Sequence, residues 1–570
     1  MVDTSQLNDD EKRLAQLGYR QELFRSWSAF NNFAISFSII CVLAGCLTSF
    51  GQAWNNGGPV VISIGWPVIA AFILMLGFCM SELLSAFPTS GGIYWWAAKL
   101  GSPKAGYYTG WLNLIGLIAI AASVAYGAAQ FFDYTMEQFF TSWPQTASPP
   151  RYFVEFLVIM VVFSLVNVLR THIISVFNSI SVWWQVVGVT VIIAILVFVP
   201  AHHQSVSWVF THRINNSGWF SGNIHGVPFW FLIVPFGFLL TQYTITGFDA
   251  SAHLSEETTG ASSSAAKGLY RSILYSAIAG WLLLLAFLFA VQPGNVSSHL
   301  GLTGAAAANG VTGETYVSSQ GGFIAALFNQ ALSPHLAGLV LGIATVSQLF
   351  CTLACITSAS RMGYAFSRDG AVPLSYLWSK LNSQKTPVNA VIGVGVVSVI
   401  ITLPALYQPK VNGIYTNVVF NSLVAIGVIG LFLAFIIPVY LRWRMGSRFQ
   451  VGPWNLGNKY KWMAPLAIAE VVIMSIVYCL PFTPQGAPWS PLFNVKLVNY
   501  APIVVLGTLI ALWLGWHLSA KKWFTGPKHT IDLPEGVTSS DEQALERAHE
   551  GFLTGEHEAF EGEHGPSSDA

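Results

Sequence analysis

The chain has 570 residues, of which 53% are hydrophobic and only 9% are charged. A soluble domain carries roughly 25% charged residues, so this composition excludes an ordinary soluble protein and places most of the chain in lipid. Lys and Arg balance Asp and Glu at 26 each, so no general attraction to nucleic acid is expected.

Residues 1–27 are predicted to form a cytoplasmic arm rather than a signal peptide. The segment is charged and lacks the apolar core that a signal peptide needs. Its leucines suit a short amphipathic helix on the inner membrane face, and a solvated arm fits the composition equally well.

Hydropathy predicts twelve membrane-spanning helices within residues 28–521. Their approximate limits are 28–50, 62–84, 106–132, 152–170, 178–200, 228–253, 271–292, 337–360, 388–406, 416–441, 462–481 and 499–520. With both termini inside, all of the 26 Lys and Arg residues lie on the cytoplasmic side except Arg151, Arg213, Lys410 and Lys496. Because basic loops favour the cytoplasm, this asymmetry predicts a multi-pass protein of the cell membrane with cytoplasmic termini.

The first span is small and polar through its middle. Its residues of this kind are Ser36, Ser38, Cys41, Gly45, Cys46, Thr48 and Ser49. Small residues let helices pack closely, whereas a break in the helix would expose backbone amides that can hold an anionic group. On this span alone, both interpretations stay open.

The sixth span stops resembling a lipid-facing helix halfway along. Thr241 and Gln242 introduce polar side chains, Gly247 interrupts the helix, and Asp249 follows. An ionised Asp at membrane depth costs roughly 2.5 to 3.5 kcal/mol on insertion scales, and broken backbone is tolerated there only inside protein or beside a water-filled cavity. The pattern predicts a discontinuous helix at a binding site. The alternative is a kinked helix whose Thr hydroxyls bond to the preceding turn.

The two interrupted spans are five apart, as expected if two five-helix repeats begin at corresponding positions. The repeats would cover about 28–200 and 228–406, and two extra helices would follow within 416–520. The halves share no convincing sequence identity, so this prediction depends on the placement of the spans.

Three sequence blocks carry a family resemblance. They are PTSGGIYWW at 88–96 with the preceding Glu82, TGFD with SEET within 246–258, and SRMGYAFSRDGAVP at 360–373. These blocks resemble those of the amino acid–polyamine–organocation superfamily, over roughly residues 20–520. Within it, GYRQELFRSWSAFNNFAISFSI near the start looks most like the GABA and choline permease branch and its bacterial amino acid permease relatives.

The resemblance implies an all-α membrane protein with a LeuT-type fold, in which two inverted five-helix repeats carry broken helices 1 and 6. It implies secondary-active uptake of an amino acid or a related amine such as GABA by alternating access. The alternatives are a non-transporting nutrient receptor on the same fold and a choline or polyamine carrier. The spans show no nucleophile–base grouping and no metal signature, so neither an enzyme nor a metal site is expected. No cofactor is expected, and the oligomeric state stays open.

The resemblance also implies substrate-binding residues in the first span. By position, the break aligns with the segment from Cys41 to Gly45, whose amides would meet a substrate carboxylate. The candidates are Cys41, Val42, Ala44 and Gly45. The family's glycine-rich pattern is not intact here, so the register is open by one or two residues.

In the sixth span, the resemblance implies that backbone carbonyls meet the substrate amine. The candidates are Tyr243, Thr244, Thr246 and Gly247, with Ile245 contributing a further carbonyl. Phe248 would form an aromatic wall. Asp249 would either meet a cationic amine or cap the second half of the helix.

Three residues are candidates for coupling transport to H⁺ or Na⁺. Gln185 occupies the place where some proton-coupled relatives carry Lys, and Gln cannot carry a proton. Glu470 lies inside the eleventh span, where an acid is a functional hypothesis by default and a hydrogen bond between helices is the alternative. Ser347 would offer a hydroxyl to sodium between the first and eighth spans. If protons drive transport, His253, Asp249 and Glu155 are further candidates.

Residues 522–570 are predicted to be a largely disordered cytoplasmic tail. Eleven of the 26 acidic residues lie between Asp532 and Asp569. Such a composition cannot bury a core.

Overall fold

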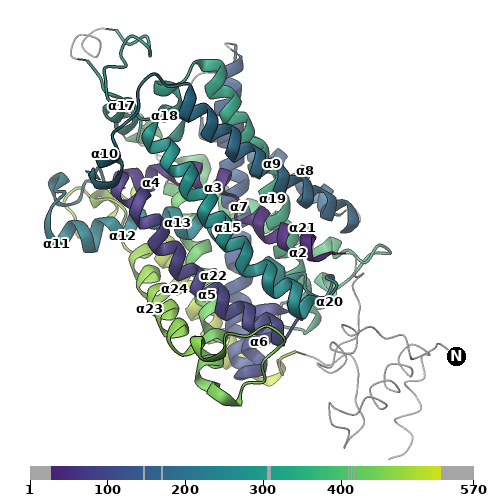
Figure 1. Cartoon of the computed structure of the whole chain (residues 1–570). Coiled ribbons are helices and arrows are strands. Elements are labelled where there is room, and N and C mark those ends of the chain that lie inside the picture. Colours follow the sequence, from purple (N-terminus) through teal and green to yellow (C-terminus); the bar gives the residue numbers. More distant parts are fainter. Residues whose placement is uncertain are drawn as a thin grey trace, which may run out of the picture.

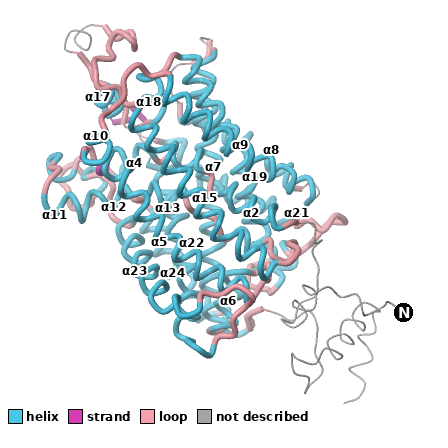
Figure 2. Tube along the Cα trace, viewed as in Figure 1, coloured by secondary structure: helices cyan, strands magenta, loops and turns pink. Residues whose placement is uncertain are grey.

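The computed structural model describes residues 27–140, 142–144, 148–168, 171–303, 310–321, 323–408, 410–411, 414–415 and 418–527. The predicted N-terminal arm, except for Trp27, and the acidic tail beyond residue 527 lie outside the described residues. What is described is mostly helical, with loops gathered at the two ends of the bundle, as Figure 2 shows. In lipid, a helix satisfies its own backbone hydrogen bonds, so an apolar chain of this length adopts helices.

Among the described residues, twelve helical segments are long and apolar enough to cross a membrane, which confirms the predicted number. The uninterrupted spans are α5 (Trp66–Ala86), α7 (Pro103–Phe139), α8 (Pro149–Asn167), α9 (Thr171–Phe198), α15 (Ala261–Phe289), α19 (Pro334–Arg368), α21 (Val388–Thr402), α22 (Val418–Met445), α23 (Tyr460–Tyr478) and α24 (Ala501–Leu518). The predicted all-α fold with broken first and sixth spans is therefore confirmed.

The first span consists of α2 (Ala29–Ile39) and α3 (Val42–Thr48). The sixth consists of α11 (Gly226–Pro228), the π-helix η4 (Phe229–Ile233), α12 (Val234–Gly237) and α13 (Leu239–Thr244), followed after a gap by α14 (Ala250–His253). The connections hold α4 (Phe50–Asn55), α6 (Gly92–Leu100), α10 (Val206–Thr211), α17 (Gly313–Ser319), α18 (Ile324–Ala331) and α20 (Ser375–Trp378). They also hold the antiparallel strand pairs β1 (Asn56–Gly57) with β2 (Ile214–Asn215), and β3 (Lys410–Val411) with β4 (Ile414–Tyr415).

Three long spans begin at the same kind of residue pair, Ser followed by Pro. The pairs are Ser102–Pro103, Ser148–Pro149 and Ser333–Pro334. Proline lacks an N–H, and its fixed φ suits the first helical position, so this pair starts a helix at little cost. In α7, the Ser102 hydroxyl also accepts a hydrogen bond from the Ala105 N–H, at 3.3 Å.

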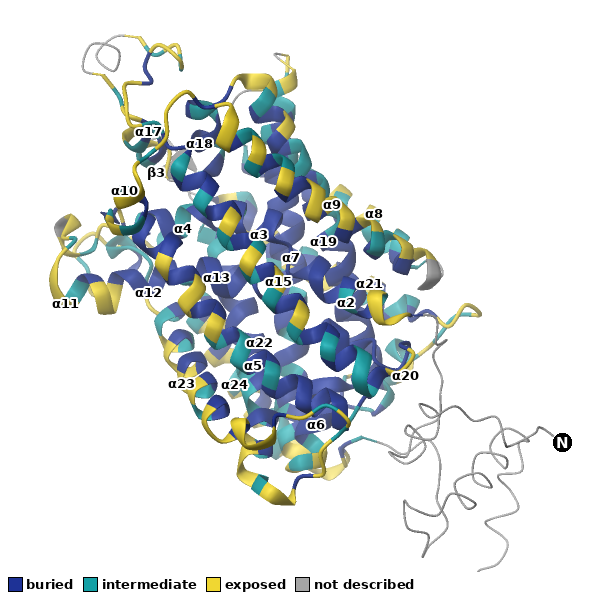
Figure 3. Ribbon diagram, in the orientation of Figure 1, coloured by how far each residue is buried: buried dark blue, intermediate teal, exposed yellow. Residues whose placement is uncertain are grey.

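The spans differ strongly in how far they are buried. The most apolar stretch of α7 is 89% buried and that of α24 is 17% buried. Buried residues gather around α3, α7 and α13, and exposed residues follow the outer faces of α8, α9 and α23 (Figures 1 and 3). The broken spans therefore lie in the centre of the bundle, where unpaired backbone groups are screened from lipid.

Candidate functional site

The sixth break lies between Thr244, the last residue of α13, and Ala250, the first of α14. Gly247 has a φ of +83°, which L side chains rarely adopt. A Cβ on Gly247 would also lie 2.2 Å from Cγ2 of Ile39, at the end of α2. Within the described residues, no hydrogen bond reaches the carbonyls from Tyr243 to Thr246. The break thus presents four open acceptors beside the first span.

The Thr hydroxyls of this segment do bond to the preceding turn. Thr244 Oγ1 donates to the Leu240 carbonyl at 2.7 Å, and Thr246 Oγ1 donates to the Gln242 carbonyl. The hydroxyl bonds of the kinked-helix alternative are therefore present. The backbone beyond Thr244 is nevertheless not helical, so the span is broken rather than only kinked.

The first break is shorter and lies earlier than predicted. Only Ile40 and Cys41 are non-helical, so the predicted segment Cys41–Gly45 overlaps the break at one residue. Val42, Ala44 and Gly45 instead form the first turn of α3. The Ala44 and Gly45 amides both bond to the Cys41 carbonyl, which closes that turn and moves the open backbone toward Ile40.

Close packing and a break both occur in the first span. A Cβ on Gly45 would lie 2.7 Å from Cα of Thr244, so glycine lets α3 lie directly against the end of α13. The structure thus brings the two breaks together. The ten predicted substrate-binding residues are all buried. Among the eight that are not glycine, Tyr243 has the largest exposed fraction, 6%.

Aromatic rings border the sixth break. The centroid of the Phe248 ring lies 5.1 Å from the ring centroid of Phe435 and 6.2 Å from that of Phe432, both on α22. The Tyr243 hydroxyl is 3.2 Å from the hydroxyl of Ser123 on α7. These neighbours fix both side chains as walls around the break.

Asp249 occupies the capping position of α14, but its side chain makes no capping hydrogen bond. Instead its Oδ2 accepts from Asn113 Nδ2 on α7 at 2.9 Å and lies 3.0 Å from Nε2 of His253. Both partners of this His–Asp pair are fully buried. The capping hypothesis is therefore wrong, and the carboxylate belongs to a polar group formed by α7 and α14.

Glu470 on α23 lies beside the sixth break. Its Oε1 accepts a hydrogen bond from Nε2 of Gln242, close to the end of α13. The hydrogen bond between helices is therefore present. Glu470 is also the only one of the three coupling candidates that carries a carboxyl group, which could take up a proton.

The other two coupling candidates reach the first span. Gln185 on α9 is buried, and its Nε2 lies 3.5 Å from the carbonyl of Phe37 in α2. Ser347 on α19 places its hydroxyl 3.1 Å from Sγ of Cys41, and the Cys351 thiol donates to the Ile39 carbonyl at 3.3 Å. Thiols and a hydroxyl therefore surround the first break.

A polar ladder that was not predicted joins α2 to α14. Ser36 Oγ donates to the Phe248 carbonyl at 2.8 Å and accepts from the Ser251 amide at 3.0 Å. Asn32 Nδ2 donates to the Ser251 carbonyl at 3.0 Å and to Thr258 Oγ1 at 2.9 Å. Asn32 and Ser36 are four residues apart and so share one helix face. This spacing could have indicated a polar face on α2, but it does not identify the segment that the face contacts.

The three sequence blocks meet at the end of the bundle that holds Trp27. Glu256 Oε1 accepts from the Ser90 amide at 2.8 Å, and its Oε2 lies 3.7 Å from Arg368. Glu257 pairs with Arg361 at 3.3 Å. Burial raises the pKa of the Glu257 carboxyl, and the Arg361 guanidinium opposes that rise. The arginines of α19 therefore hold the loop after α14 to a neighbouring helix, and we call the group the ion-pair cluster.

The same end is tied to the start of the described chain. The Trp27 amide donates to the Glu257 carbonyl at 2.9 Å, and the Thr259 amide donates to the Trp27 carbonyl at 3.0 Å. These bonds add to the ladder, so the segment before α2 and the segment after α14 are joined at two levels.

The opposite end is hollow. A cavity of about 220 Å³ opens there between α7, α8, α17 and α18, and Glu137 and Tyr134 are among the residues that line it. A separate space of about 10 Å³, room for about one water molecule, lies between this cavity and Leu47 and Thr48 of α3. Nearby, Arg151 pairs with Asp133 at 2.5 Å. The hollow therefore lies on the α3 side of the broken spans without opening onto them in this conformation, and the ion-pair cluster covers the other end.

Comparisons with known proteins agree with this arrangement. A family model described as "Amino acid permease" matches residues 28–509. The chain is 34% identical to the amino-acid permease BAT1 of Arabidopsis thaliana, over 92% of this chain and 97% of the relative. It is 34% identical to the BAT1 homolog of Oryza sativa subsp. japonica, over 91% and 96%. It is 26% identical to a putative polyamine transporter of Candida albicans, over 94% and 92%.

Proposed function

Since this chain belongs to the amino acid permease family, we propose that it takes up an amino acid or a related amine by secondary-active, alternating-access transport. The observation that carries the proposal is the contact between two broken spans at Gly247 and Ile39, beside four carbonyls that no donor among the described residues reaches. Backbone groups freed at membrane depth are tolerated when they serve a buried site.

In this proposal, the substrate amine binds the carbonyls from Tyr243 to Thr246. The substrate carboxylate faces the amides at the start of α3, next to Cys41. Phe248 and Tyr243 enclose the apolar part of the substrate, and Asp249 attracts the amine through the electrostatic field of its carboxylate. All of these groups are buried, so the described conformation corresponds to a closed site.

We assign the ion-pair cluster to the cytoplasmic side, with both termini inside the cell and the protein in the cell membrane. The distribution of Lys and Arg supports this orientation. The hollow end then faces outward, as uptake requires. Residues 28–200 and 228–406 would be the two inverted repeats, with the spans after residue 416 outside them.

We assign coupling to protons rather than sodium. Sodium is a hard cation that prefers oxygen ligands, and the groups at the first break include the thiols of Cys41 and Cys351. The buried Asp249–His253 pair combines a carboxyl group and an imidazole, the side-chain types that form proton relays within membrane spans. It lies on α14, which the ladder joins to α2, so its protonation can bias the movement of both half-helices.

The deciding experiment is flux of radiolabelled solutes into proteoliposomes that contain the purified chain. The panel holds GABA, choline, polyamines and the common amino acids, each tested with an imposed pH or sodium gradient. We expect accumulation of an amino acid or GABA that follows the pH gradient. Binding without flux would favour a nutrient receptor. Accumulation of polyamines alone would move the assignment toward the function named for the Candida albicans relative.

A further inference from the structure

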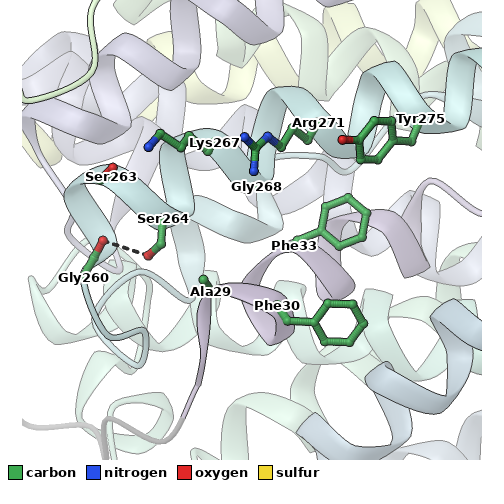
Figure 4. A pocket seen from close by; sticks show the side chains of 10 residues that line it. All are labelled: Ala29, Phe30, Phe33, Gly260, Ser263, Ser264, Lys267, Gly268, Arg271 and Tyr275. Atoms are coloured by element: carbon green, nitrogen blue, oxygen red, sulfur yellow. Dashed lines mark hydrogen bonds between the residues drawn. The ribbon is translucent and has the colours of Figure 1, made fainter.

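A groove of about 560 Å³ runs along the outside of the bundle near the Trp27 end, between the start of α2 and the start of α15. Figure 4 shows Lys267, Arg271 and Tyr275 in a row along α15, across from the rings of Phe30 and Phe33 on α2. The Phe33 and Tyr275 rings are 6.0 Å apart and meet edge to face. The groove therefore combines positive charge at one end with aromatic surface at the other. We call it the basic groove.

The two cations have no acidic partner in the part of the chain that the structure describes. None of the residues that line the basic groove is acidic, and no ion pair of Lys267 or Arg271 occurs among the described residues. Four residues separate them, so they lie about 6 Å apart along the helix axis. Two unneutralised cations at this spacing suit one phosphate group between them.

The face of α15 beyond Arg271 continues as an apolar stripe. Tyr275, Ile278 and Leu282 follow at helical spacing and are 50%, 52% and 49% exposed. Half-exposed apolar side chains on a membrane span face acyl chains. The cations thus lie where the stripe ends. Arg271 is about 27 Å along the axis from Phe289, the last residue of α15, which is close to the ~30 Å thickness of a hydrocarbon core and so favours a place for the cations near the lipid headgroups.

The chain's own N-terminal arm is the competing occupant, because residue 26 precedes the groove directly. Charge favours it little. Residues 1–26 carry five acidic residues against four basic ones, and the ten residues nearest to Trp27 carry Arg20 and Arg25 against Glu22. The lipid bilayer supplies an anionic group and an acyl chain together, at the right depth.

We propose that the basic groove binds an anionic phospholipid of the leaflet at the Trp27 end. The phosphate lies between Lys267 and Arg271, and an acyl chain follows Phe30, Phe33 and the stripe on α15. Gly268 lets α2 pack directly beneath the groove, since a Cβ there would lie 3.3 Å from the Phe33 amide. The bound lipid therefore bridges α15 to the half-helix of the first span that leads to the break.

The test is photo-crosslinking of the full chain in phosphatidylcholine proteoliposomes. Each preparation contains a small fraction of either phosphatidylserine or phosphatidylcholine with the same photoactivatable acyl chain, and labelled peptides are found by mass spectrometry. We expect peptides that hold Phe30, Phe33 or Tyr275 to be labelled about tenfold more by phosphatidylserine, as two cations near an anionic headgroup imply. The Lys267→Gln/Arg271→Gln variant should lose this preference.

The matched control is Arg444→Gln/Arg448→Gln, which removes two exposed cations with the same sequence spacing. In this control variant, phosphatidylserine should still label the peptides of α2 and α15 more strongly than phosphatidylcholine does. In the unmodified chain, excess phosphatidylserine without the photoactivatable group should reduce the labelling, and inorganic phosphate should not. This competition tests the proposal even if the variant fails to fold. Equal labelling by the two lipids, equal loss in the control, or labelling of peptides from residues 1–26 in place of those from α2 and α15 would each overturn the proposal. The readout needs no flux, so its failure leaves the proposed transport untouched.

Discussion

The two broken spans leave the helix by different means. The sixth break depends on one residue, Gly247, whose φ of +83° excludes nearly every other side chain. In the first break, Ile40 and Cys41 have φ values of −71° and −78°, which any residue can adopt. The sixth break is therefore determined by a single local residue, whereas the first break depends on tertiary contacts with neighbouring helices.

The surroundings of the breaks differ as well. Carboxyl groups flank the sixth break, at Asp249 and, through Gln242, at Glu470. Thiols and a hydroxyl flank the first, at Cys41, Cys351 and Ser347. In the proposed mechanism, the sixth span therefore both binds the substrate amine and responds to protons, whereas the first span offers close-packed amides to the substrate carboxylate.

Replacing Gly247 with Leu should have the largest effect. The side chain would impose strain of about 1–3 kcal/mol at positive φ and would overlap Ile39, so substrate flux should fall at least about a hundredfold. Flux into proteoliposomes and size-exclusion profiles measure activity and folding. The control is Gly507→Leu on α24, where a Cβ meets nothing within 4 Å. Normal flux in Gly247→Leu would remove the site from the sixth span.

Replacing Gly45 with Ala should have the next largest effect. Its Cβ would press on the Thr244 backbone and separate α3 from α13, so flux should fall about tenfold. Gly363→Ala on α19 is the matched change, since the nearest atom to its Cβ is 3.6 Å away. If both variants transport equally well, close packing at the first break is not needed for function.

Asp249→Asn should separate coupling from binding. Asn keeps the size of the side chain and can still bond to Asn113, but it cannot cycle a proton with His253. We expect accumulation driven by a pH gradient to fall about tenfold while exchange of substrate at equal pH changes less than about threefold. Loss of both activities would indicate that the carboxylate binds the amine directly, and retained affinity for a cationic substrate would exclude that contact.

Glu470→Gln should have the smallest effect. The amide can keep a hydrogen bond to Gln242, so flux should stay within about threefold of the unmodified chain. The dependence of flux on the pH gradient should also be retained. Loss of that dependence with normal exchange would transfer the proton-carrying role from the Asp249–His253 pair to Glu470.

The number of spans and the sixth break were predictable from the sequence, because hydropathy and a glycine beside an Asp are local signals. The first break was misplaced, because the bonds from the Ala44 and Gly45 amides to Cys41 depend on packing rather than on residue type. Partners distant in the chain were not predictable either. The ladder between Asn32 and Ser251 and the bond between Gln242 and Glu470 each join residues more than 200 positions apart.

The thiol of Cys351, which donates to the carbonyl of Ile39 at the end of α2, has a practical consequence. Any conformation that admits solute to the centre must also admit a small alkylating reagent to this sulfur or to Cys41. The rate of modification would then report how often the molecule opens, without an introduced label. A saturating solute should slow that reaction, and the reagent size at which it stops would measure the width of the passage.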